Sequence, residues 1–426
     1  MSRSLGDWLR RLERLHPHSI ELGLERCGRV YERLGRPVLA ERIWSVAGTN
    51  GKGSVTAFLS AMAASAGLSA GCYTSPHILR FNERIRIDGV DMEDAEIVDA
   101  LRRVEEARGE ISLTFFEFTT LAAFTLFAER DLDAVVLEVG LGGRLDAVNL
   151  VDAHCSVITP IGLDHVEYLG PDRERIALEK AGIIRAGRPV VIGDRNPPQS
   201  LRDKVDAISA IPSYLGADFD IGDTENGRRY LGRDAIELPA RLPLPGAHQW
   251  DNLAVALTAF TVLMDLGELD TDWLSRALAA VRLSGRLQAW PGDERIILDV
   301  GHNPMAARAA AEFLRGYPAS ETICVLGMLS DKDVGRAVQA LSPHIAHWYC
   351  AGLDGDRAQA GDELAERVRA QLPAASVRDF RSVSEALTVA RTMAGNGARI
   401  LVFGSFHTVE DAIHCLQSAE AGRDQC

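Results

Sequence analysis

A glycine-rich segment near the start of the chain has the composition of a phosphate-binding loop. Residues 47–54 read Ala-Gly-Thr-Asn-Gly-Lys-Gly-Ser and lie between a short apolar run and a segment rich in Ala, Leu, Met and Phe at helical spacing. A loop between a strand and a helix exposes backbone N–H groups that bind phosphate, and Lys52 can reach the terminal phosphates of a nucleotide. The standard P-loop spacing is not met, because Val46 replaces the first glycine and Gly53 separates Lys52 from Ser54. The alternative is a glycine-rich turn with a solvated lysine. The residues predicted to bind phosphate are Gly48, Thr49, Asn50, Gly51, Lys52, Gly53 and Ser54.

Three polar side chains are expected near this loop. Ser75 follows a second predicted strand, Glu138 ends a buried third strand, and His165 comes after a fourth. The carboxyl ends of parallel strands meet at one edge of a sheet, so these residues are expected on the rim that carries the phosphate loop. A buried carboxylate such as Glu138 requires a cation, a metal or hydrogen bonds. The simpler interpretations are a Ser-Pro-His turn for Ser75, a salt bridge from Glu138 to Arg144, and an ordinary loop histidine at 165.

Two further segments carry groups that can act on a substrate. Lys180 lies in a predicted amphipathic helix over 173–184, where spacing alone makes it a solvated lysine. Asp299, His302 and Asn303 follow a predicted strand, and Pro304 is typical of the first position of a helix. An Asp, a His and an Asn in one tight loop can bind ribose or amino-acid groups. The alternative is that Asn303 only caps the helix.

The elements that position these residues alternate between strand and helix. Short continuous apolar runs separated by helical segments indicate a parallel sheet covered on both faces. The proline-rich stretch 194–245 is expected to be irregular, with a small β section. A second α/β series starts at Arg295, after a cluster of Ser, Gly and Pro. The fold class is α/β in two domains: a larger P-loop-type parallel-sheet ATPase domain over 1–288 and a smaller Rossmann-like α/β domain over 289–426.

Composition narrows the class of protein. The chain has 60 acidic and 46 basic residues and a net charge of −14, which disfavours nucleic acid as a partner. No apolar run reaches the roughly 18–20 residues that span a bilayer, so no membrane partner is expected. The seven cysteines are scattered without a C-x-x-C pair. Their pattern favours reduced thiols in the cytoplasm over disulfides or structural zinc.

Taken in order, these motifs resemble the bifunctional dihydrofolate synthase/folylpolyglutamate synthase family of the Mur ligase superfamily. The resemblance runs over nearly the whole chain. One departure is Gln249, which stands where many superfamily members carry Asn after His. The most specific matching segments are Val46–Ser54, Ser75–His77, Arg84–Ile87, Leu113–Glu117, Leu137–Asp146, Leu163–His165, Glu179–Ile183, Ser284–Arg286, Asp299–Pro304 and Gly404–Thr408.

The resemblance implies roles that spacing does not assign. Lys52, Lys180 and His302 would be catalytic, with Lys180 carbamylated and His302 near the incoming glutamate. The cofactors would be ATP and Mg²⁺, and a monovalent cation is allowed. The residues implied around two Mg²⁺ ions are Ser75, Glu138 and His165.

The resemblance also implies two binding regions. The residues implied to contact the nucleotide from the domain interface are Asn252, Arg286 and Asp299. The residues implied to line the pterin-substrate pocket are Ser19, Ile20, Glu21, Leu22, Thr114, Phe115, Phe116, Glu117, Leu145, Asp146 and Ala147.

The implied reaction joins L-glutamate to dihydropteroate. ATP would phosphorylate the carboxylate, and the amine of glutamate would displace phosphate from the acyl phosphate to give dihydrofolate. Tetrahydrofolates would be the second substrate class, extended through γ-linked amides. Domain closure would bring Asp299 and His302 to the phosphate loop and exclude water.

Two rival interpretations remain. A cell-wall Mur ligase usually carries a whole nucleotide-sugar domain before the loop, and the residues before Gly48 are too few for one. A nucleotide-binding regulatory protein without a ligase step would have no reason to keep Glu138, His165 and Lys180 together. No strong oligomerisation signal is present, so a monomer is expected.

Overall fold

The computed structural model describes residues 3–16, 20–225, 227–233, 235–264, 271–355, 357–395 and 397–423. Ser19, predicted for the pterin pocket, lies outside these residues. The chain divides into two compact units. The first unit comprises Met1–Gly162, Val166–Pro243 and Trp250–Arg282, and the second comprises Leu163–His165, Leu244–Gln249 and Leu283–Cys426.

The first unit is built on an eight-stranded sheet with the order β4-β3-β2-β5-β1-β6-β7-β8. The strands from β2 to β8 in this order are parallel, whereas β3 and β4 are antiparallel. The fully buried central strands have apolar residues on both faces, as a covered parallel sheet requires. The strands are β1 (Arg42–Ala47), β2 (Ala70–Tyr73), β3 (Ile85–Ile87), β4 (Val90–Asp91), β5 (Ala134–Glu138), β6 (Cys155–Ile158), β7 (Pro189–Ile192) and β8 (Ile211–Tyr214).

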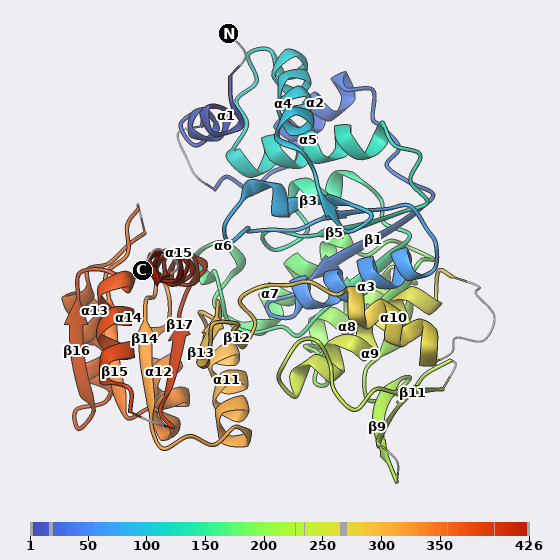
Figure 1. The fold of residues 1–426 in the computed structure, drawn as a ribbon. Helices are drawn as coiled ribbons and strands as arrows, with labels where there is room; N and C mark the ends of the chain where they lie inside the picture. The colour runs from blue at the N-terminus through green and yellow to red at the C-terminus, as the bar shows by residue number, and fades with distance from the viewer. Residues whose placement is uncertain are drawn as a thin grey trace. The chain divides into compact units, whose positions relative to one another are not determined.

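Helices cover both faces of this sheet. Helices α4 and α5 lie on one side of β1 and β5, and α3, α9 and α10 lie on the other (Figure 1). On the second side Trp44 of β1 stacks on Phe260 at 6.1 Å, and Phe260 stacks on Trp273 at 5.4 Å between ring centroids. The helices are α1 (Leu5–Leu12), α2 (Glu25–Arg33), α3 (Lys52–Ser65), α4 (Asp94–Arg108), α5 (Phe115–Ala128), α6 (Val166–Leu169), α7 (Arg173–Lys180), α8 (Gln199–Ala207), α9 (His248–Thr261) and α10 (Thr271–Ala280), with 3₁₀ turns η1 (Phe81–Arg84), η2 (Ala147–Leu150) and η3 (Ala181–Ile183).

The stretch 194–245 is more regular than its composition predicts. The expected small β section is present as an antiparallel sheet of β9 (Asp220–Thr224), β10 (Gly227–Leu231) and β11 (Ile236–Leu238). The prediction nevertheless missed α8 and the edge strand β8. Helix α8 begins after Pro198 and buries only Leu201 and Val205 along its length, so its apolar stripe is too short to stand out in the sequence.

The second unit contains a six-stranded sheet with the order β12-β13-β17-β14-β15-β16, parallel except for β12. Its strands are β12 (Gln288–Trp290), β13 (Asp293–Asp299), β14 (Thr322–Leu326), β15 (His347–Ala351), β16 (Ser376–Phe380) and β17 (Arg399–Phe403). Its helices are α11 (Pro304–Gly316), α12 (Val334–Leu341), α13 (Gly361–Gln371), α14 (Val383–Met393) and α15 (Phe406–Arg423), with the turn η4 (Ser342–His344). Helices α11, α12 and α13 contribute to one apolar core over the sheet. The α/β fold class predicted from the sequence is confirmed.

No helix among the described residues is long and apolar enough to cross a membrane.

Candidate active site

The predicted phosphate loop connects β1 to α3 at the centre of the large sheet. Gly51 precedes α3 with a φ of 90°, a left-handed conformation that glycine adopts without strain. A Cβ atom on Gly48 would lie 1.7 Å from Oγ1 of Thr159, so the loop packs too closely there for any side chain. Lys52 Nζ lies 3.2 Å from the carbonyl oxygen of Gly48 and 3.4 Å from that of Thr49. The lysine is the first residue of α3, and its side chain is folded back over the loop that precedes the helix.

Replacing Gly48 with alanine should destabilise the first unit by more than the backbone strain of the substitution would by itself. Gly67, just after α3, has a φ of 78°, and an added Cβ would meet no atom within 4 Å, so Gly67→Ala should cost about 1–2 kcal/mol. Gly48→Ala adds the collision with Thr159 and should cost more than about 3 kcal/mol. Urea denaturation midpoints of the two variants would compare them, and equal losses would contradict the close packing at Gly48.

Two buried side chains from other elements reach the same loop. Lys180, at the end of α7, is 4% exposed, and its Nζ donates to the carbonyl oxygen of Gly48 at 2.8 Å. Asn252 of α9 is buried, and its Oδ1 lies 2.6 Å from the position of a Cβ on Gly51. The interpretation of Lys180 as a solvated helix lysine is therefore wrong. Helical spacing could not reveal this burial, because it arises where the end of α7 packs on the glycine-rich turn after β5.

Ser75 and Glu138 lie together at the carboxyl ends of β2 and β5. The backbone N–H of Ser75 donates to Oε2 of Glu138 at 3.3 Å, and Glu138 is 5% exposed. Arg144 pairs with Glu179 at 2.9 Å, so the alternative in which Arg144 neutralises Glu138 is wrong. A hydroxyl and a carboxylate are the oxygen ligands that Mg²⁺ prefers.

Several of the described residues predicted for the pterin pocket form a network of polar and charged side chains at the start of α5. Thr114 and Glu117 form a capping box, in which the N–H of Thr114 donates to Oε2 of Glu117 at 2.8 Å. Arg26 of α2 donates to Oε1 of the buried Glu117 at 3.1 Å and also pairs with Glu21. These contacts bring two predicted segments together. Ile20 and Leu22, on either side of Glu21, are half-buried.

Phe116 and Asp146 meet the glycine-rich turn that follows β5. A Cβ on Gly140 would lie 2.6 Å from the ring of Phe116. Asp146, between Leu145 and Ala147, is buried and accepts backbone N–H groups at 2.8 and 2.9 Å. Burial raises the pKa of Asp146 to about 6, although backbone hydrogen bonds and the charge of Lys52 oppose the shift. Because the charge of Lys52 lowers the pKa of Asp146, Asp146 lies within electrostatic reach of the phosphate loop.

The pH dependence of stability should carry the signature of Asp146. Folding raises its pKa from 3.8 to about 6, so its stabilising contribution is fully present below pH 3.8 and is lost as the pH rises through about 6. The melting temperature of the wild type minus that of Asp146→Asn should therefore fall between about pH 4 and pH 7. A constant difference across this range would contradict the raised pKa.

In the second unit three predicted residues, Arg286, Asp299 and Asn303, lie before β12, at the end of β13 and just after β13, respectively. Asp299 is buried and accepts backbone N–H groups at 2.7 and 2.9 Å. Burial raises the pKa of Asp299, against the charge of nearby Arg286. Arg286 also lies over the ring of Phe406, at 5.3 Å. Asn303 caps α11, as the simpler interpretation of this loop predicts.

Asp164 is the centre of an ionic cluster in the second unit. Its carboxylate lies 2.7 Å from Nζ of Lys332, 3.3 Å from Nε2 of His302 and 3.2 Å from Nδ2 of Asn303. Burial opposes its charge, but the hydrogen bond and charge of His302, with the charges of His165 and Lys332, hold the pKa of Asp164 well below its usual range.

His165, one of the three predicted metal ligands, takes part in the same cluster. Nε2 of His165 lies 3.4 Å from Nζ of Lys332, and both residues belong to the second unit, whereas Ser75 and Glu138 belong to the first. Lys332 was missed from the sequence, although its place after β14, beyond a carboxyl strand end, was an available signal.

The residues predicted to bind metal supply only part of a metal site. Among the described residues, no group of three or more His, Cys, Asp and Glu side chains is arranged to hold a metal. Ser75 and Glu138 supply oxygen donors, and Mg²⁺ commonly completes its shell with substrate phosphates and water. The pair at the strand ends is therefore compatible with Mg²⁺ bound together with a nucleotide.

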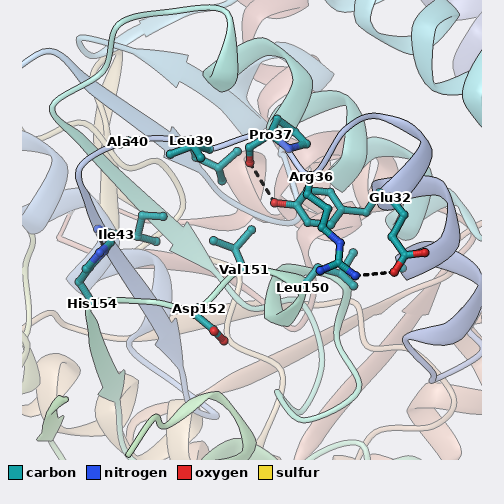
Figure 2. Close-up of a pocket in the computed structure, with 13 residues that line it drawn as sticks. Glu32, Arg36, Pro37, Leu39, Ala40, Ile43, Leu150, Val151, Asp152 and His154 are labelled. Carbon is teal, nitrogen blue, oxygen red and sulfur yellow. Dashed lines mark hydrogen bonds and ion pairs between the residues drawn. The ribbon is translucent and has the colours of Figure 1, made fainter. Parts of the chain in front are cut away.

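A pocket of about 520 Å³ opens elsewhere in the first unit (Figure 2). It is lined by parts of α2, residues 36–40, residue 43, residues 150–152 and residue 154. Ile43 and His154 lie at the amino ends of β1 and β6, and the N–H of Ile43 donates to Nδ1 of His154 at 3.1 Å. The pocket contains none of the predicted site residues and lies at the opposite end of the strands from the phosphate loop.

Comparison with known proteins gives the class of this chain. The Mur ligase middle domain matches residues 46–260, and the Mur ligase glutamate ligase domain matches residues 285–406. The first match includes the phosphate loop, and the second includes the cluster around Asp299. The fold and these domains define an ATP-dependent ligase of the Mur type.

Relatives that match over nearly the full length narrow this class. Dihydrofolate synthase/folylpolyglutamate synthase of Escherichia coli strain K12 is 38% identical over 420 residues, which cover 98% of this chain and 97% of the relative. The solved structure of Escherichia coli FolC with DHPP and ADP has a TM-score of 0.91 at 37% identity, covering 98% of this chain and 99% of the other. A solved bifunctional folylpolyglutamate synthase/dihydrofolate synthase with Mn, AMPPNP and L-glutamate bound has a TM-score of 0.87 at 40% identity and covers 98% of each chain. The chain belongs to the dihydrofolate synthase/folylpolyglutamate synthase family.

Proposed function

We propose that this chain joins L-glutamate to dihydropteroate to form dihydrofolate, and adds further glutamates to reduced folates through γ-linked amides. The observation that carries this proposal is the full-length likeness to bifunctional synthases solved with nucleotide and L-glutamate bound. The phosphate loop, with Lys52 and Lys180 both directed at Gly48, supplies the ATP-dependent half of such a reaction.

The chemistry requires activation, because a carboxylate and an amine do not condense in water. A carboxylate oxygen of the substrate attacks the γ-phosphorus of ATP, the bond to the bridging oxygen breaks, and ADP leaves. The neutral α-amine of glutamate then attacks the acyl carbon, phosphate leaves with the bonding electrons, and the amine loses its proton to solvent. Lys52 and the loop N–H groups stabilise the charge that develops on the transferred phosphoryl group.

The metal and lysine roles are part of the same proposal. Ser75, Glu138 and His165 hold two Mg²⁺ ions, which when bound neutralise phosphate charge. The oxygen donors at the ends of β2 and β5 support this assignment. Lys180 is proposed to be carbamylated, and the buried position of its Nζ beside the loop supports a role there rather than in solvent.

The remaining assignments concern binding and assembly. Asn252, Arg286 and Asp299 are proposed to contact the nucleotide, and His302 to lie near the incoming glutamate. The ionic cluster of Asp164 with His302 and Lys332 supports an amino-acid carboxylate site in the second unit, because these two side chains already hold one carboxylate. The enzyme is proposed to act as a monomer in the cytoplasm.

A paired substrate assay tests the proposal. Purified protein with ATP, Mg²⁺ and L-glutamate is given dihydropteroate in one reaction and tetrahydrofolate in another. Both reactions are expected to release ADP and to lengthen the pterin substrate by glutamate, as measured by mass spectrometry. A product in only one reaction would remove the other activity from the proposal, and no product in either would reject it.

A further inference from the structure

Arg84 is a buried cation that forms no ion pair with any carboxylate of the described residues. It ends η1 and is 8% exposed. Its Nε donates to Nδ1 of His77 at 2.7 Å, and the hydroxyl of Tyr73 lies nearby. Within the described part of the chain, no ion pair joins Arg84 to a carboxylate. Burial accordingly lowers the pKa of Arg84.

Glu138 and Glu83 attract Arg84 electrostatically, but each of them is hydrogen-bonded to backbone N–H groups. Glu83 accepts the backbone N–H groups of residues 78, 79 and 80, at 2.9, 2.8 and 2.8 Å. Glu138 accepts the N–H of Ser75 and belongs to the proposed metal site. An unpaired buried charge is costly to keep, so an arginine in this position needs an anionic ligand to account for it.

Arg84 lies between the predicted pterin pocket and the loop that carries Ser75, so an anion bound to it would lie there too. The guanidinium lies 5.6 Å from the ring of Phe81 and 5.4 Å from that of Phe115, and cation–π contacts offset only part of its desolvation. Phe115 begins α5 and belongs to the predicted pterin pocket. The carbonyl oxygen of Arg84 accepts the N–H of Thr74 at 2.9 Å, which fastens η1 to the loop that carries Ser75.

We propose that Arg84 binds the carboxylate group of the pterin substrate that is to be phosphorylated. The proposal rests on the proposed function and names the residue that receives the reacting group. A guanidinium forms paired, charge-assisted hydrogen bonds to a carboxylate, and these strengthen where water is excluded. The rings of Phe81 and Phe115 pack against the guanidinium and limit its movement, which favours one position for the bound carboxylate.

The variant Arg84→Met tests this role, with Arg86→Met as the matched control. Arg86 lies on the adjoining strand β3 but pairs with Asp91 at 2.7 Å and is partly exposed. Arg84→Met should lower kcat/KM for dihydropteroate by at least about 100-fold while the affinity for AMPPNP changes by less than about twofold. Arg84→Lys should recover part of the loss, and Arg86→Met should stay within about threefold of the wild type.

Binding measurements separate recognition of the carboxylate from a structural role. The wild type should bind dihydropteroate at least about tenfold more tightly than its carboxamide analogue, and Arg84→Met should bind the two equally. The melting temperature of the ligand-free Arg84→Met protein should equal or exceed that of the wild type, because a buried unpaired charge is replaced by an apolar side chain.

The outcomes distinguish this inference from the proposed function. If the wild type forms dihydrofolate but Arg84→Met keeps its kcat/KM or its preference for the carboxylate, the role of Arg84 is wrong and the ligase remains. A lower melting temperature with unchanged discrimination would also overturn the inference, because it would make Arg84 a structural residue. If the wild type itself binds nucleotide but forms no dihydrofolate, the proposed function fails.

Discussion

Replacing Lys52 with alanine is expected to lower kcat/KM for ATP by about 100- to 1,000-fold. The ammonium group lies over the phosphate loop, where it meets the charge that develops as the γ-phosphoryl group is transferred. The side chain is half-buried and makes only long hydrogen bonds to two loop carbonyls, so the melting temperature should change by less than about 2 °C. Steady-state ADP release and thermal denaturation measure the two effects.

Lys204 provides the control for this substitution. It lies on α8 of the same unit, is also half-buried, and makes no side-chain contact with the phosphate loop. Lys204→Ala should retain ADP release within about twofold of the wild type. If Lys52→Ala retained turnover at the level of Lys204→Ala, the loop would not carry the phosphoryl-transfer step.

The substitution Glu138→Gln is expected to weaken metal-dependent turnover by about 100-fold. Glutamine keeps the shape of the side chain and one oxygen that can accept the N–H of Ser75, but it removes the negative charge at the end of β5. The concentration of Mn²⁺ needed for half-maximal activity should therefore rise together with the loss in kcat. Titration of ADP release with Mn²⁺ measures both quantities.

Asp133 gives a control at the other end of the same strand. It precedes β5, and its Oδ2 accepts the N–H of Ser69 at 2.9 Å. Asp133→Asn removes one negative charge while leaving the carboxyl ends of the strands unchanged. An unchanged metal requirement in Glu138→Gln, equal to that of Asp133→Asn, would contradict the proposed metal site.

Prediction of the fold was most accurate for short apolar runs that have polar or turn residues on both sides. In the predicted second α/β series, β14 and β17 are fully buried runs flanked by polar or turn residues, which is the pattern that the prediction relies on. Helix α8 was missed, because two buried apolar residues are too few to define a helical face. Prediction from periodicity therefore succeeds for the sheet and weakens for the elements at its edge.

The sequence predicted which residues of the site lie close together, but not which charged side chains pair with each other. The strand-end rule brought Ser75 and Glu138 together, but the choice of Glu179 as the partner of Arg144 depends on how α7 packs against a distant turn. The burial of Lys180 and of Arg84 has the same origin. Both residues would be solvated on an isolated element, and only packing from segments far away in the sequence buries them.

The most direct measurement is the coupling between ADP release and dihydrofolate formation. In the presence of Mg²⁺, ATP, dihydropteroate and L-glutamate, the ligase account predicts one ADP for each dihydrofolate formed. Omission of either dihydropteroate or glutamate should abolish net turnover. Steady ADP release in the absence of dihydropteroate and glutamate would contradict the assignment of this chain as a glutamate ligase. ADP release that yields no dihydrofolate in the complete mixture would also contradict it.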